Sequence, residues 1–599
     1  MLSFDTSCLK WFGLILIVGL SAHPCLPQEP LTRARGELDA GQVTPAIRVL
    51  IDYCRLHPAD PRVYNLLGIA YAREGDIVQS LEMFRRFARL APDKPQAYNN
   101  LGATYLRLGD EDKAERAFRR SLALRPDDVN VLYNLGALLN AMHQYTAARP
   151  LLQRAFSHQR SAPIVYELAV AIAGSGDHEV ALRLIGSMPP PAGIHRLPWL
   201  RLLGTLNLKE GNLEEASRFL GKALELAPND NGTLYALAVV RLKSRRTAEA
   251  ISLLDKTMTS VPPSQRCARI ADILVHFGAT DAAIQEFERA IELDPHSYSA
   301  FYNLAILRLG RGKDLPGAFQ AAEQALAIRP SAEIHDLLGD ICDDEGHFRQ
   351  ALEHYQQAVQ MGPDNDRFIF DLGVELILHN NYDVAQTIFQ IAEKRFPRSA
   401  RVALGLGAAE YMEGKRHRAV IAFLDAVNLD SSYRPAYLFL GEAADFAGTH
   451  LPLVIAKLSQ IARQEPGSFG IQYYYGAALV SRMDHTGNLA DAGKTLAILR
   501  RAASLNPRDP RVYYQMGEIA RLQHRDCDAL PMYRRAISLD PEFADALYKL
   551  AQAYVHQGRK EDAQRLFARQ RKVVVEEKQE LYHRSGAIES FILQIRNAK

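Results

Sequence analysis

The sequence is poor in cysteine, with six residues among 599, and no two of them lie near each other. This spacing excludes a short zinc knuckle or a redox pair, and bridges between such distant positions are not expected in a fold of local contacts. We therefore predict that Cys54, Cys267, Cys342 and Cys527 are buried or half-buried thiols that act as small apolar side chains. The chain also has little excess of charge of either sign, since it contains 71 basic and 69 acidic residues. That balance gives no reason to expect nucleic acid or an anionic membrane as a partner.

Motifs that carry catalysis or bind cofactors are absent as well. No two histidines lie four residues apart, and no Gly-x-Ser-x-Gly nucleophile elbow occurs. Gly405-Leu406-Gly407 lacks the third glycine and the preceding strand of a dinucleotide loop. His347, Glu353 and His354 are interpreted as exposed helix residues and not as a metal site. The sequence thus predicts no enzymatic activity, no cofactor and no metal site.

What the sequence does contain is a repeat. Pro58, Pro92 and Pro126 fall 34 residues apart, and glycine, large apolar and small residues keep the same register between them. A fixed period of this length indicates one small structural unit copied along the chain.

The unit is predicted to be a pair of helices. In the copy from Val63 to Pro92, apolar residues recur at helical spacing on both sides of the break at Gly75-Asp76. Pro92 ends the second helix because it lacks a donor and disfavours helix at the preceding residue. Gly68 and Ser80 are small where the two helices cross, whereas Phe84 fills the gap. One such pair cannot bury its own apolar face, so stability depends on stacking neighbours.

The pattern resembles that of the tetratricopeptide repeat family, which has a large residue, Leu-Gly, Tyr, Ala, an aromatic residue, Ala and a closing Pro. The copies at Tyr98–Pro126 and Tyr513–Pro541 match it best. Counted on the family's period, about sixteen repeats fill 31–575. The resemblance implies an all-α fold, namely a right-handed α-solenoid superhelix of stacked helix-turn-helix repeats.

The resemblance also implies a function and a site. Proteins of this family generally bind proteins or extended peptides along a concave groove, so the chain is expected to be a non-enzymatic scaffold or adaptor. Asn100, Asn134 and Asn303 take a position that faces this groove in the family, where an amide can donate to and accept from a peptide backbone. The sequence leaves open that these residues are only solvated polar groups on an exposed helix face. Glu167, Leu202 and Ala236 interrupt the row.

A second interpretation belongs to another class. Long arrays with asparagines in the groove resemble the substrate-recruiting arms of sugar transferases that modify proteins. The chain could therefore be the recruiting arm, or a partner subunit, of a separate glycosyltransferase-like enzyme.

The two ends of the chain and two interruptions complete the predicted organisation. Residues 1–22 contain an apolar run as long as the core of a signal peptide. Residues 23–30 form a short proline-rich segment. We expect export to a periplasmic or extracellular location; the alternative is a membrane anchor formed by the uncleaved N-terminal segment. Insertions are predicted near 186–198 and 481–494, where the first contains three consecutive prolines. A C-terminal helix at 576–599 is expected to cap the last repeat.

Overall fold

The computed structural model describes residues 29–310 and 314–580 of the chain. Within these ranges the regular structure consists of α-helices and short 3-10 helices, and no strand occurs. The predicted signal peptide lies outside the described residues, as does the predicted C-terminal helix beyond Glu580. None of the helices in the described ranges is long and apolar enough to cross a bilayer.

The chain forms two compact units, 1–286 and 287–599, which divide within α16 (Thr280–Leu293). Helices alternate between the first and the second member of a pair. In unit 1 the first helices are α1 (Glu29–Asp39), α3 (Pro61–Glu74), α5 (Pro95–Arg107), α7 (Val129–Ala141), α9 (Ala162–Gly174), α11 (Arg196–Lys209), α13 (Asn231–Lys243) and α15 (Pro263–His276). The second helices are α2 (Val43–Leu56), α4 (Ile77–Leu90), α6 (Glu111–Leu124), α8 (Tyr145–His158), α10 (His178–Gly186), α12 (Leu213–Leu226), α14 (Thr247–Thr257) and α16.

Unit 2 continues the same alternation. Its first helices are α17 (Tyr298–Gly310), α19 (Ala332–Asp344), α21 (Asp366–Leu378), α23 (Ala400–Met412), α25 (Arg434–Glu442), α27 (Phe469–Thr486), α29 (Pro510–Leu522) and α31 (Ala544–His556). The second helices are α18 (Leu315–Ile328), α20 (Phe348–Met361), α22 (Tyr382–Arg395), α24 (Arg416–Leu429), α26 (Leu451–Gln464), α28 (Ala492–Leu505), α30 (Asp526–Leu539) and α32 (Lys560–Glu580).

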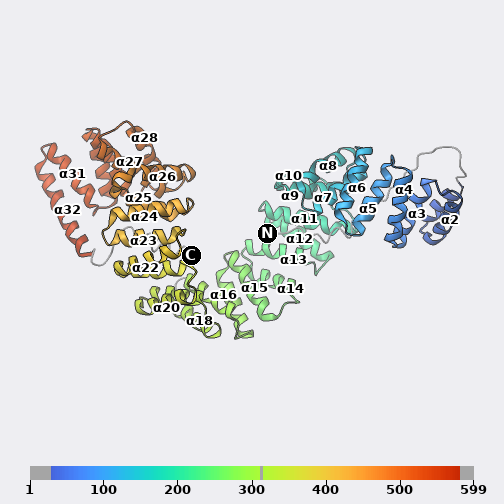
Figure 1. The fold of residues 1–599 in the computed structure, drawn as a ribbon, viewed down its shortest axis with the longest axis horizontal. Helices are drawn as coiled ribbons and strands as arrows, with labels where there is room; N and C mark the ends of the chain where they lie inside the picture. The colour runs from blue at the N-terminus through green and yellow to red at the C-terminus, as the bar shows by residue number, and fades with distance from the viewer. Residues whose placement is uncertain (1–28, 311–313, 581–599) are drawn as a thin grey trace. The chain divides into compact units, whose positions relative to one another are not determined.

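Within each unit the helices stack in chain order (Figure 1). A first helix contacts the second helix of its own pair, as α5 contacts α6, and also the first helix of the next pair, as α7 contacts α9 and α21 contacts α23. The predicted all-α solenoid of helix pairs is therefore confirmed.

The turns inside the pairs follow from local chemistry. Gly75 ends α3 in the left-handed region at φ 95, and the Asp76 side chain accepts a hydrogen bond from the Gln79 N–H at the start of α4. A glycine adopts this conformation without steric cost, and a capping aspartate satisfies one otherwise unpaired donor. In other repeats a larger residue takes the same left-handed turn: His143, Arg245, Asn380 and His524.

The two helices of a pair approach closely at one glycine. A Cβ on Gly68 would lie 2.5 Å from Phe84 Cε1, and one on Gly102 would lie 2.6 Å from Phe118 Cε1. Ser80 adds a buried hydrogen bond of 2.8 Å from its Oγ to the Gly68 carbonyl. The same steric contact recurs in unit 2, at Gly339 with Tyr355, Gly373 with Phe389, Gly407 with Phe423, and Gly517 with Tyr533.

The two predicted insertions take different forms. Between α10 and α11 the chain has no α-helix from Ser187 to His195, only the short 3-10 helix η2 (Gly193–His195), yet the two flanking helices contact each other. Near 481–494, α27 extends to Thr486 before a short loop leads into α28.

The cysteines follow the prediction except at one position. Cys267 and Cys342 are buried and Cys54 is half-buried, but Cys527 is exposed. Its predicted burial is wrong because it lies in the first turn of α30 on a side that no neighbouring helix covers.

Unit 1 contains a buried carboxyl group, Glu167, which is 7% exposed. Glu167 of α9 accepts a hydrogen bond of 2.8 Å at Oε2 from Asn140 Nδ2 of α7. Burial raises the pKa of Glu167 to about 7, although the Asn140 hydrogen bond acts in the opposite direction. The protonated form is therefore favoured in the folded chain.

The glycine contact predicts opposite effects of one substitution at two sites. Gly102→Ala should destabilise unit 1 by roughly 1–3 kcal/mol, because the added methyl group overlaps the buried Phe118 ring. Gly221→Ala in the interior of α12 should stabilise it by about 0.5–1 kcal/mol, since nothing lies within 4 Å of the new Cβ. Urea unfolding midpoints measure both effects, and equal shifts for the two variants would contradict the steric explanation.

Glu167 predicts a pH dependence. The unfolded chain releases this proton near pH 4.5, whereas the folded chain holds it up to about pH 7, so the stability from this group falls between these pH values. Glu167→Gln keeps an acceptor for Asn140 and should remove the fall, leaving the variant more stable than the wild type above pH 8 by roughly 3 kcal/mol at most. Unfolding midpoints at pH 5 and pH 8 test this. Glu179→Gln, at a side chain that is 71% exposed, is the matched control and should leave the profile unchanged.

Candidate functional site

Two of the predicted partner-binding asparagines link neighbouring first helices. Asn100 Nδ2 of α5 donates to Asn65 Oδ1 of α3 at 2.8 Å, and Asn134 Nδ2 of α7 donates to Asn99 Oδ1 of α5 at 3.1 Å. The structure thus repeats one amide-to-amide contact in successive repeats.

Both interpretations of the sequence assumed that these amides are exposed. Asn100 and Asn134 are instead buried. Asn100 is 0% exposed and Asn134 is 4% exposed, and each side chain bonds to an asparagine of the preceding first helix. Asn303 lies in unit 2 on α17, where it is half-buried. The role of the three asparagines in partner binding stays a prediction.

A row of arginines occupies the start of three consecutive first helices in unit 2. These are Arg367 of α21, Arg401 of α23 and Arg434 of α25, and their side chains are 41%, 38% and 54% exposed. The helices are neighbours, since α21 contacts α23 and α23 contacts α25. The row is not among the sequence predictions, although arginines 34 and then 33 residues apart were a visible signal.

Carboxylates hold each guanidinium of the row. Arg367 Nη2 lies 2.6 Å from Asp336 Oδ2 of the preceding repeat, whereas Arg401 Nη1 lies 3.7 Å from Asp366 Oδ1. Arg434 Nε lies 3.3 Å from Glu465 Oε2. Burial alone would lower the pKa of Arg367, but the Asp336 and Asp371 carboxylates raise it. The row therefore presents fixed positive charges that remain partly open to solvent.

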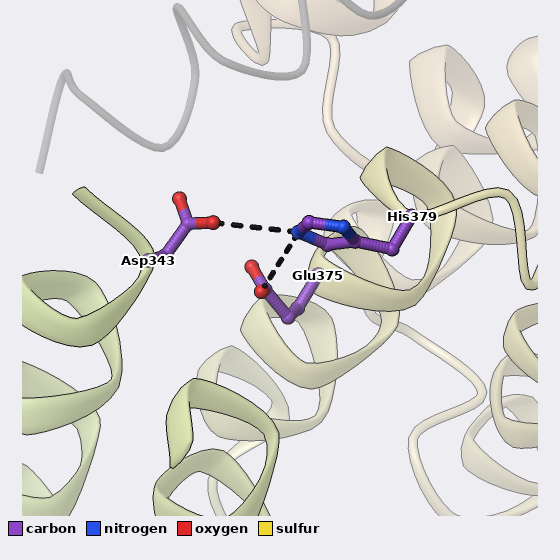
Figure 2. A group of neighbouring side chains, drawn as sticks. All are labelled: Asp343, Glu375 and His379. Carbon is purple, nitrogen blue, oxygen red and sulfur yellow. Dashed lines mark ion pairs between the residues drawn. The ribbon is translucent and has the colours of Figure 1, made fainter. Parts of the chain in front are cut away.

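A second group of side chains joins α19 to α21 and the turn that follows it. Figure 2 shows the His379 ring directed at two carboxylates, one from each helix. His379 Nε2 lies 3.3 Å from Glu375 Oε1 and 3.6 Å from Asp343 Oδ1. The Glu375 side chain is 0% exposed, whereas the Asp343 and His379 side chains are 15% and 36% exposed.

This group is not among the sequence predictions, which concerned His347 and His354. The structure does not join His347 to His354: His347 Nδ1 lies 3.2 Å from Glu345 Oε2, and His354 Nδ1 lies 3.1 Å from His335 Nδ1. Burial lowers the pKa of both His335 and His354, which favours their neutral forms. The four-residue spacing of Glu375 and His379 was the available signal, because it directs both side chains to the same side of a helix.

Curated relatives match parts of the chain. Tetratricopeptide repeat protein 6 of Homo sapiens is 28% identical over 127 residues, which covers 21% of this chain and 24% of that protein. Protein O-mannosyl-transferase TMTC1 of Homo sapiens is 24% identical over 176 residues, which covers 28% of this chain and 20% of that protein. The chain therefore spans a quarter or less of the length of these two relatives.

Among solved structures, one chain of the APC/C hetero-tetramer Cut9–Hcn1 aligns with this chain at 16% identity and a TM-score of 0.33. The alignment covers 86% of this chain and 98% of that chain. Tetratricopeptide repeat families match residues 60–127, 202–230, 269–333, 344–409 and 528–581. These segments occur in both units and fall on helices of the pairs described above. The chain belongs to the tetratricopeptide repeat family.

Proposed function

We propose that the chain is a non-enzymatic scaffold that binds proteins or extended peptides along the surface formed by its successive first helices. The family and its repeated helix pairs support a role in protein interaction. The observation that carries the proposal is the arginine row, because it repeats one binding chemistry in three neighbouring repeats of unit 2.

The row has the physical properties of an anchor for acidic side chains. A guanidinium binds a carboxylate through two parallel hydrogen bonds, and it keeps its charge at any physiological pH. At 3.7 Å and 3.3 Å, the contacts of Arg401 and Arg434 with their own carboxylates are longer than a good charge-assisted hydrogen bond. Arg434 also donates from Nη2 to Ser468 Oγ at 2.8 Å, so a partner carboxylate would compete only with the two longer carboxylate contacts.

Substitutions at the amide contacts of unit 1 would not give a clear test of partner binding. Replacing Asn100 and Asn134 with alanine would leave Asn65 Oδ1 and Asn99 Oδ1 without their donors inside the fold. Such a loss costs roughly 1–3 kcal/mol for each buried group, so weaker binding could not be separated from a weaker fold. The arginines, whose side chains are partly exposed, give the cleaner test.

A second candidate is the recruiting arm, or a partner subunit, of a separate enzyme that transfers sugars to proteins. The match to a protein O-mannosyl-transferase favours it, although that match covers only 20% of the transferase. An enzyme of this class among the captured partners would support this candidate over a general scaffold.

The arginine row predicts the effect of reversing two charges. Arg401→Glu combined with Arg434→Glu should weaken capture of partners from the native source at least tenfold, because two anchoring cations become repulsive. The measurement is affinity capture with quantitative mass spectrometry, followed by titration of each purified partner. Arg395→Glu combined with Arg463→Glu, on the second helices α22 and α26, is the matched control and should bind as the wild type does. Equal binding by both double variants, or equal loss, would contradict the proposal.

We further propose that the chain is exported, on the basis of the apolar segment at its N-terminus. The segment is typical of a signal peptide that is cleaved after Ser21 or Ala22. Mass spectrometry of the mature N-terminus should find a chain that begins at Ala22 or His23. An intact N-terminus on protein recovered from a membrane fraction would favour the anchor instead.

A further inference from the structure

We propose that Asp343, Glu375 and His379 form a binding site for a divalent transition metal ion, with Zn²⁺ as the best-suited ion. Each residue offers one ligand atom, and these atoms lie within 4.8 Å of one another. The donors are one imidazole nitrogen and two carboxylate oxygens, contributed by two neighbouring repeats (Figure 2).

The distances fit a shared ion better than direct hydrogen bonds. His379 Nε2 lies 3.3 Å from Glu375 Oε1 and 3.6 Å from Asp343 Oδ1. A charge-assisted hydrogen bond between imidazole and carboxylate would be about 2.7–2.9 Å long. Two ligands bound tetrahedrally at about 2.1 Å from Zn²⁺ are separated by about 3.4 Å, which lies between the two observed values.

Local structure holds the three donors in place. Glu375 and His379 are four residues apart, so one helical turn directs both to the same side. The backbone N–H of His379 donates to the backbone carbonyl of Glu375 at 3.2 Å. The His379 ring lies over Phe348 of α20, with ring centroids 3.9 Å apart, which restricts its rotation. The site is thus organised before an ion arrives.

The burial of the Glu375 carboxylate favours the binding of a cation at this position. The Glu375 side chain is fully buried, and transferring a carboxylate from water into a protein interior is costly unless a positive charge compensates it. A divalent ion would balance both carboxylates while His379 stays neutral and acts as a ligand. With three protein ligands, a fourth position would remain for water.

The donor set also selects among ions. Mg²⁺ and Ca²⁺ prefer oxygen ligands only, whereas imidazole nitrogen favours Zn²⁺ and its neighbours in the first transition row. An ion bound here would connect α19 with α21, so its binding free energy would add to the interface between two adjacent repeats. Binding should therefore also raise the unfolding temperature.

The test uses the untagged full chain, stripped with a chelator and titrated with ZnCl₂ against a competing chelating dye. The wild type should bind one more equivalent of Zn²⁺ than His379→Gln and Asp343→Asn, or bind it at least tenfold more tightly. His347→Gln is the matched control, because His347 also lies near a carboxylate, Glu345, but has no second donor from another repeat. It should bind Zn²⁺ as the wild type does.

Two further measurements keep the proposal falsifiable. Co²⁺ should give visible absorption bands in the wild type that are lost in His379→Gln, and Zn²⁺ should raise the unfolding temperature of the wild type only. Glu375→Gln serves as a third variant if it folds; if it does not, the other two decide. Equal Zn²⁺ stoichiometry and affinity in the wild type and in His379→Gln would overturn the assignment. Binding of Mg²⁺ or Ca²⁺ that matches Zn²⁺ and survives the loss of His379 would overturn it as well.

Discussion

The structure depends on the close approach of two helices at a single glycine in many of the repeats. Phe118 fills the space that a side chain at Gly102 would need, and the same arrangement recurs at Gly68 with Phe84 and at Gly373 with Phe389. This contact sets the distance between the helices of a pair, and stacking the pairs then buries the apolar face that no single pair could cover. Because a solenoid repeat packs against its neighbours in the chain, each part of the surface is formed by residues of adjacent repeats.

Several polar groups of this fold lie at the interfaces between repeats. Asn100 bonds to Asn65, and Arg367 bonds to Asp336, in each case across two neighbouring first helices. Such groups help to fix the register of one repeat on the next, since a buried donor left without its acceptor is costly. The scaffold proposed for this chain therefore draws on side chains that also connect its repeats, and only the partly exposed ones, such as Arg401 and Arg434, are open to a partner.

The proposed binding of partners and the proposed metal site concern different parts of unit 2. The arginine row lies at the start of its first helices, whereas His379 and Asp343 lie at or near the ends of α21 and α19. A metal ion at those ends would stiffen one junction between repeats. Partner binding along the row and metal binding are therefore separate properties, and each can fail without the other.

The sequence by itself determined the helix pairs, their turns and the family. These features depend on neighbours along the chain: Gly75 ends a helix because of its own backbone freedom, and Pro92 follows the end of another because it lacks an N–H. Tertiary structure alone decided that Asn100 is buried, that Cys527 is exposed, and that Asp343 meets Glu375 and His379. The physical reason is that these outcomes depend on how side chains pack on neighbouring helices, and the spacing of residues along one repeat does not record that packing.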